Sequence, residues 1–181
     1  MPSNHSEAAQ VDAAKMIVAD TEKRVNIGSE QRELADVIAI LSDVHTQGLQ
    51  EYPVLVILFT GSGSPPDCIR MKRRPIPPSG FVLSRDFPER FGQALAVNAA
   101  VHDGAVAFAR SRLSDPYRCT GWSYLICAKS CLESVDCNRG AAYNSAMFLS
   151  ASPSIDCVAL FSAAELEVFV NGKRAVKLSK D

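Results

Sequence analysis

The sequence predicts an α/β fold in which a central, mixed and twisted β-sheet is flanked by helices and ends in a C-terminal β-hairpin. Three observations support this fold class. Short apolar runs such as Val54 to Thr60 are typical of strands that are buried on both faces. Segments with helical apolar spacing, such as residues 34–44, separate these runs. Near the end of the chain, the turn Asn171-Gly172 lies between two segments of strand character.

The predicted helices rest on apolar periodicity and on residues that begin or end helices. Ser29 is a plausible N-cap, and Gly48 closes the helix that it begins. Asp86 caps a later helix, with Pro88 and Glu89 in its first turn. The predicted spans are 6–25, 29–48, 86–101 and 138–149. The first span belongs to an N-terminal segment, residues 1–28, and the other three belong to a domain over residues 29–181.

Six strands complete the predicted fold. Apolar runs predict strands at 54–60, 105–109, 123–128 and 157–161. Residues 165–170 alternate in polarity, so this strand is expected to have one wet face. The Asn171-Gly172 turn leads to a return strand over residues 174–178, and a loop rich in Gly and Pro fills residues 61–80. Because helices alternate with buried strands, an α/β sandwich is expected.

The composition is that of an ordinary globular domain. The chain has 181 residues, of which 47% are hydrophobic and 22% charged, and its formal net charge is −1. This length supports one sizeable core, and the charge gives no sign of nucleic acid or of an anionic membrane as a partner. No apolar run is long enough to span a bilayer. The N-terminus lacks the basic and apolar regions of a secretion signal, so we expect a cytoplasmic protein.

The cysteines are expected to be reduced and to serve as small buried side chains. Cys127, Cys131 and Cys137 have the spacing C-x3-C-x5-C, which is uncommon for zinc, and no histidine lies nearby to complete a tetrahedron. We therefore favour packing over a metal cluster at these positions.

Asp103-Gly104-Ala105 is the first candidate site, because it lies between a predicted helix and a buried strand. A carboxylate at this position can hold a divalent metal or activate a hydroxyl, and Gly104 lets a ligand approach the backbone closely. The alternative is a tight turn in which Asp103 accepts backbone hydrogen bonds. Taken alone, the tripeptide favours the turn.

The second and third candidates are a helix start and a strand end. Asn138-Arg139-Gly140 opens a helix, and free N–H groups at a helix start bind phosphate, here with help from Arg139. The alternative is that Asn138 is a simple N-cap. Between Ser162 and Glu165, a hydroxyl and a carboxylate leave the sheet and can serve a phosphate or its metal. An ordinary turn between antiparallel strands is the alternative there.

Two further segments carry weaker signals. Residues 60–64, Thr-Gly-Ser-Gly-Ser, follow a buried strand and offer a phosphate cradle. They lack the Lys of a P-loop and the third Gly of a dinucleotide fingerprint, which favours a flexible loop. We interpret a local basic cluster as a solvated loop face in preference to a ligand contact. Its members are Arg70, Lys72, Arg73 and Arg74.

Taken in order, the three candidate sites resemble those of diadenylate-cyclase (DAC) domains of the DisA N-terminal type. That family carries an Asp-Gly-Ala motif, then a Gly-Thr-Arg-His-Arg-Ala-Ala motif that opens a helix, then a buried strand that ends in Ser-Glu-Glu. Residues 103–105 match the first motif. Residues 137–142 occupy the second motif and keep only its Ala pair. Residues 162–164 occupy the third and keep only its Ser. The resemblance covers residues 30–177.

The resemblance implies a DAC-like fold and a purine nucleotide, either ATP or a cyclic dinucleotide, as the ligand. It implies Asp103 as a catalytic residue that binds Mg²⁺ or Mn²⁺ and helps to activate a hydroxyl, with Glu165 as a second metal ligand. In the family, two ATP-loaded domains face each other, which implies a homo-oligomer. The implied nucleotide-binding residues are Gly104, Ala105, Gly121, Trp122, Leu125, Asn138, Arg139, Gly140 and Ser162.

Departures from the family pattern lead us to expect nucleotide binding or sensing with poor cyclisation or none. Asn138, Arg139 and Gly140 stand where the family has Arg-His-Arg, and Ala163 and Ala164 replace its acidic pair. Each lost electrostatic contact costs roughly 2–4 kcal/mol of transition-state stabilisation, whereas binding survives such losses better. One alternative is an active diadenylate cyclase that condenses two ATP molecules into cyclic di-AMP. The other is a protein-interaction module that uses the fold without a nucleotide.

Overall fold

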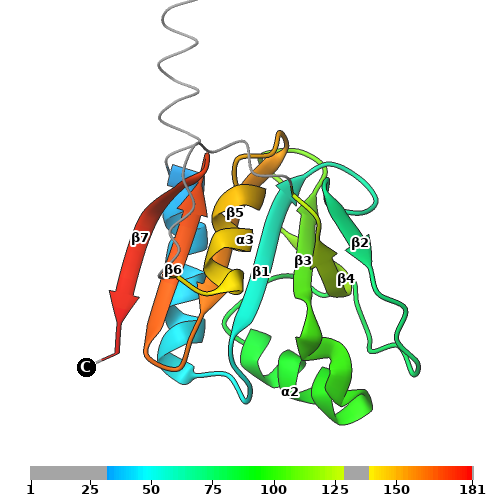
Figure 1. The fold of residues 1–181 in the computed structure, drawn as a ribbon. Coiled ribbons are helices and arrows are strands. Elements are labelled where there is room, and N and C mark those ends of the chain that lie inside the picture. Colours follow the sequence, from blue (N-terminus) through cyan, green and yellow to red (C-terminus); the bar gives the residue numbers. More distant parts are fainter. Residues whose placement is uncertain (1–31, 129–138, 181) are drawn as a thin grey trace, which may run out of the picture. The chain divides into compact units, whose positions relative to one another are not determined.

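The computed structural model describes residues 32–128 and 139–180 (Figure 1). The chain divides into two compact units, residues 1–37 and 38–181, and the second unit contains the sheet. Several predicted features lie outside the described residues: the helix at 6–25, the Ser29 cap, Asn138, Cys131 and Cys137. Within the described ranges, no helix has the length and apolarity needed to cross a membrane.

A seven-stranded mixed sheet forms the centre of the second unit, in the order β2-β4-β3-β1-β5-β6-β7. β1 and β3 are parallel, and every other pair of neighbouring strands is antiparallel. This arrangement confirms the predicted α/β class with a mixed sheet. The strands are β1 (Val54–Thr60), β2 (Cys68–Arg70), β3 (Ala105–Arg110), β4 (Arg118–Ile126), β5 (Ile155–Phe161), β6 (Glu165–Val170) and β7 (Lys173–Ser179).

Helices cover both faces of this sheet (Figure 1). On one face, α3 (Ala141–Leu149) packs against β5 and β6, and its residues join a core cluster with Ala107 and Leu160. Side chains alternate along strands, so Phe108 and Phe161 point to the other face. There Phe108 meets α2 (Phe87–Val97), and Phe161 meets the ring of His45, which lies in the part of the helix over residues 32–47 that belongs to the second unit.

Several predicted boundaries are wrong. The helix expected to reach Val101 ends at Val97, because Asn98 is extended and its side chain caps a following 3-10 helix, η1 (Ala99–Asp103). The predicted loop at 61–80 contains the short strand β2. β4 begins five residues earlier than predicted, since Arg118 and Cys119 already pair with β3. α3 begins at Ala141, with Gly140 and not Asn138 as its N-cap.

The predicted wet face of β6 is also wrong. Phe169 is fully buried and Glu167 is 5% exposed. α3 covers this face, where the ring of Tyr143 meets Phe169 edge-on at 4.9 Å. Glu167 tolerates burial because Arg174 donates a hydrogen bond to it at 2.7 Å.

The C-terminal hairpin is confirmed. Asn171 and Gly172 connect β6 to β7 with φ angles of 51° and 73°. Positive φ at both central residues gives the turn a twist that matches the right-handed twist of the strands. The hairpin leaves β7 at one edge of the sheet, with Lys173, Arg174 and Lys177 exposed along it. The opposite edge strand, β2, has only three residues.

A polar network closes the end of the sheet where β1 and β3 finish. Asp156 accepts hydrogen bonds at 2.7 Å from both the Thr60 hydroxyl and the Tyr117 hydroxyl. Its carboxylate also lies 3.3 Å from the buried Arg110 guanidinium, which stacks on the Tyr117 ring at 4.6 Å. Burial, helped by the bond to Asp156, raises the pKa of Tyr117 well above its ordinary value, so this hydroxyl stays protonated.

Asp156→Ala is expected to lower the free energy of unfolding by about 2–4 kcal/mol, because it removes the anionic partner of a buried guanidinium. Chemical denaturation measures this change. Asp43→Ala is the matched control, since the ion pair of Asp43 is with the exposed Arg85 at 3.7 Å. The control is expected to cost under about 1 kcal/mol. Equal losses for the two variants would contradict the assignment.

His45 lies at the end of the helix over residues 32–47 and is 4% exposed. Neither ring nitrogen has a hydrogen-bond partner among the described residues. Burial, and secondarily the charge of Lys180, lowers its pKa below the ordinary 6.5. Below that pH the unfolded chain takes up a proton that the folded chain refuses, so stability falls as the pH decreases.

His45→Leu is therefore expected to flatten the acid side of the stability profile. Between about pH 7.5 and 5.5, the free energy of unfolding should fall more steeply for the natural chain than for the variant. Denaturation at a series of pH values gives the two curves. Parallel curves would show that His45 does not carry the effect.

Candidate functional site

A bulge in β4 organises the start of β3. Ala105 pairs with Tyr124 and Ala107 pairs with Gly121, so β4 has one residue more than β3 between these pairs. The extra residue leaves Ser123 fully buried with a φ of 57°. Bulges of this kind change the direction of a side chain and are common beside functional sites.

Ser123 connects the bulge to the end of η1. Its hydroxyl lies 3.1 Å from the Val101 carbonyl oxygen, to which it donates, and it accepts a hydrogen bond from Arg73 Nε at 3.1 Å. The Ser123 carbonyl in turn accepts from the Met71 N–H at 2.9 Å. One residue thus joins η1, β4 and the segment that follows β2.

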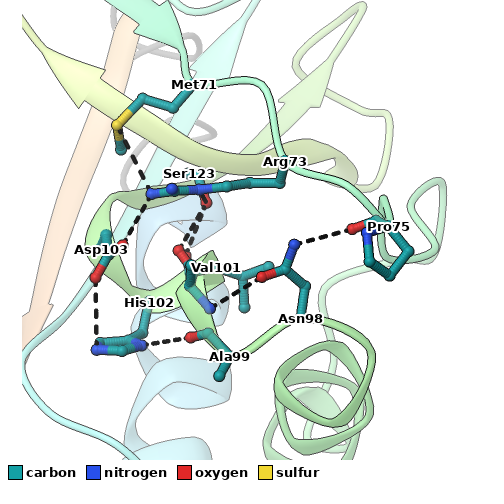
Figure 2. A network of polar contacts seen from close by, with 10 residues as sticks. Met71, Arg73, Pro75, Asn98, Ala99, Val101, His102, Asp103 and Ser123 are labelled. Carbon is teal, nitrogen blue, oxygen red and sulfur yellow. Dashed lines mark hydrogen bonds and ion pairs between the residues drawn. The ribbon is translucent and has the colours of Figure 1, made fainter.

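Arg73 is the principal partner of Asp103. Figure 2 shows the guanidinium between Ser123 and the carboxylate, with Arg73 Nη2 at 3.0 Å from Asp103 Oδ2. The other carboxylate oxygen lies 3.7 Å from His102 Nε2. The Asp103 side chain is 51% exposed, so one side of this carboxylate is open to a ligand.

Position 104 has no room for a side chain, so it requires glycine. Its φ of −147° is open to any residue, but a Cβ there would lie 2.9 Å from backbone atoms of Ser123 and Tyr124 and 2.8 Å from Met71 Cε. The absence of a side chain therefore lets the start of β3 lie directly against the bulge. Asp103 is connected to a neighbouring pocket through Arg73, which is one of the residues that line it.

That pocket has a volume of about 380 Å³. Its wall is partly apolar and strongly basic. The guanidinium of Arg70 lies flat against Gly121, where a Cβ would come within 2.8 Å of Cζ. All four cations of the basic cluster line this cavity, and Arg70, Lys72 and Arg74 are exposed, as expected for the predicted solvated loop face. The lining residues are Arg70, Met71, Lys72, Arg73, Arg74, Ile76, Pro77 and Trp122.

Trp122 and Leu125 occupy different surroundings on β4. Trp122 is 2% exposed, its ring stacks on Phe87, and its Nε1 donates to the Pro78 carbonyl at 2.9 Å. It is therefore mainly a core residue with one edge in the pocket. Leu125 is 50% exposed and lies opposite Ile69 on β2, which is 60% exposed. Exposed apolar pairs of this kind are available to a flat apolar ligand.

Arg139 and Glu165 belong to a second polar group, on the face covered by α3. Arg139 lies 4.6 Å over the Tyr143 ring and 3.7 Å from Glu167, which also binds Arg174. Glu165 forms an ion pair with Lys177 at 2.7 Å, and this partner lowers the pKa of the Glu165 carboxyl. Both predicted residues are therefore engaged with charges of their own sheet.

Ser162 makes the contacts of a turn residue. Its hydroxyl accepts from the Glu165 N–H at 2.8 Å and donates to the Glu165 carbonyl at 3.1 Å. The strand register places Ser162 at the same end of the strands as Asp103, because Val54 at the start of β1 pairs with Phe161. β1 lies between the two strands, so their backbones are separated by about 10 Å. Residues 60–64 lie at the opposite end of the strands, where β1 and β3 finish.

The described residues offer little to a metal ion by themselves. Among them, no group of three His, Cys, Asp or Glu side chains is placed to hold one. Asp103 contributes a single half-exposed carboxylate. Mg²⁺ is commonly held by one or two carboxylates plus phosphate oxygens, so Asp103 fits a cation that arrives with a phosphate-bearing ligand.

No protein-family model matches the chain, and no curated protein or solved structure matches it.

Sequence reasoning missed Arg73 and Ser123 as members of the site. The basic cluster gave a signal for Arg73, but its partner Asp103 lies 30 residues away and no local pattern connects the two. Ser123 gave no signal, because a bulge depends on how β4 pairs with β3.

Gly104→Ser is expected to destabilise the fold by about 1–3 kcal/mol, since the added side chain would meet backbone that has no room to move. Gly140→Ser is the matched control, because a Cβ at Gly140 meets nothing within 4 Å and serine is a good N-cap. Thermal and chemical denaturation give both values. A harmless Gly104→Ser would show that the close contact with the bulge is dispensable.

Proposed function

We propose that the domain binds a purine nucleotide at the end of the sheet where β3 begins, and that it is a DAC-like domain that cyclises poorly or not at all. The observation that carries this proposal is the placement of Asp103-Gly104-Ala105 against the β4 bulge, beside a basic pocket with an apolar wall. Carboxylate, cations and apolar surface are the groups that a nucleotide needs.

The nucleotide has a surface for each of its parts. Cations at the pocket suit the phosphates, and the close contact of Gly104 with the bulge holds Asp103 beside Arg73. Leu125 and Ile69 provide exposed apolar area for a base. In the DAC family, the position of Leu125 belongs to the nucleotide site, which supports this assignment.

Binding is favoured over cyclisation because the two implied metal-binding carboxylates belong to different polar groups, Asp103 beside the β4 bulge and Glu165 on the face covered by α3. Asp103 meets Arg73 at 3.0 Å, and Glu165 meets Lys177 at 2.7 Å. When bound, Mg²⁺ or Mn²⁺ would neutralise phosphate charge and lower the pKa of a coordinated hydroxyl. Each carboxylate would have to release its basic partner before it held such an ion.

Leu125→Ala is expected to weaken ATP binding by at least about fivefold while leaving the affinity for inorganic tripolyphosphate unchanged, because only the base uses apolar surface. Calorimetry on the full chain with Mg²⁺ measures both affinities. Leu113→Ala is the matched control, since Leu113 is similarly exposed, at 41%, in the loop after β3. ATP that binds no more tightly than tripolyphosphate would refute the proposal.

The same samples test the cyclase alternative. Incubation with ATP and Mn²⁺ is expected to yield little or no cyclic di-AMP. Rapid product formation that disappears in Asp103→Asn would establish an active cyclase in place of a binding domain.

A further inference from the structure

The segment that follows β2 concentrates positive charge at one cavity. Four of the five residues from 70 to 74 are Arg or Lys, although the whole chain has a net charge of −1. All four line the pocket of about 380 Å³, and none of the eight lining residues is acidic. A cavity lined by one sign of charge focuses the field and attracts ligands of the opposite sign.

The pocket cations are held in different ways. Gly121 gives Arg70 space to lie against β4. Ser123 holds Arg73 through Nε, while Nη2 is bound to Asp103. Arg73 can therefore change its outer partner while its inner contact to the bulge stays in place. A half-exposed ion pair contributes little to stability, so this change of partner costs little.

We propose that this pocket binds the phosphate chain of a di- or triphosphate ligand, and that Arg73 exchanges Asp103 for the bound phosphate. This inference deepens the proposed function and rests on it for the nature of the ligand. Phosphate recognition would then come from residues 70–74, away from the position 138–140 where the DAC family places its Arg and His residues.

A polyphosphate fits this pocket better than a single small anion does. Three guanidinium groups and one ammonium group present many hydrogen-bond donors. Each guanidinium group can bind two phosphate oxygens at once through two parallel N–H donors. The volume also lies within the range of small-ligand pockets, about 300–1,000 Å³. Ile76, Pro77 and Trp122 add apolar surface to the lining of the pocket.

The shared use of Arg73 makes Asp103 an internal competitor of the phosphate. A ligand that takes Arg73 leaves the Asp103 carboxylate without its partner, and a change that removes the carboxylate charge leaves Arg73 available. Removing the charge of Asp103 should therefore strengthen phosphate binding measured without any divalent cation.

Titration calorimetry of the full chain with inorganic tripolyphosphate, in the presence of a chelator and at low salt, tests the inference. The double variant Arg70→Gln with Arg74→Gln is expected to weaken binding by at least about tenfold. Arg85→Gln is the matched control for a lost charge, since Arg85 is 80% exposed and lies outside the pocket. It should change the affinity less than about twofold.

Asp103→Asn is expected to raise the tripolyphosphate affinity by about three- to tenfold. Asp43→Asn removes the same charge away from the pocket and should leave the affinity nearly unchanged. Circular dichroism confirms that each variant is folded. No binding by the natural chain, equal losses for the double variant and Arg85→Gln, or weaker binding by Asp103→Asn would each overturn the inference.

Failure of this inference is distinguishable from failure of the proposed function. If ATP binds and Leu125→Ala weakens it, while tripolyphosphate does not bind, the proposed function stands and the phosphate pocket is wrong. If tripolyphosphate binds as expected but ATP binds no more tightly, the pocket stands and the purine site is wrong.

Discussion

The extra residue that β4 carries opposite Ala105 and Ala107 determines the arrangement of everything near Asp103. It turns Ser123 into the left-handed region, where the buried hydroxyl reaches the end of η1 and the backbone carbonyl holds Met71. Gly104 can approach only because it has no side chain. The bulge, the 3-10 helix and the segment after β2 are therefore joined by direct contacts around the Asp103 carboxylate.

The balance between the Asp103 carboxylate and the cations of residues 70–74 then controls which ligands this part of the domain attracts. Asp103 is the single carboxylate that the described contacts bring against the basic segment, and it is bound by one of the pocket cations. In the absence of a ligand, this ion pair neutralises the Asp103 carboxylate and part of the positive charge of the cavity. A phosphate-bearing ligand would relieve the excess of positive charge, and a cation accompanying it would take the place of Arg73 at Asp103. Anion and cation are thus expected to assist each other.

The predictable parts of the fold are those that local patterns control. The predicted and observed bounds of β1 agree, because a strand buried on both faces is a continuous apolar run in the sequence. The predicted turn at Asn171-Gly172 is also observed. Burial of Glu167 escaped prediction, since it depends on α3 and on basic residues from other elements. The pairing of Arg73 with Asp103 escaped for the same reason. Within the candidate site, sequence order predicts Asp103, but its partners depend on how the strands and loops pack around it.

The two edges of the sheet have a consequence for self-association. β7 exposes Lys173, Arg174 and Lys177 along its length, and two copies of this strand side by side would bring like charges together. The opposite edge offers only the three residues of β2, too few for a stable ladder of hydrogen bonds. Both edges therefore oppose growth of the sheet from one molecule into the next, which protects the chain from fibre-like aggregation.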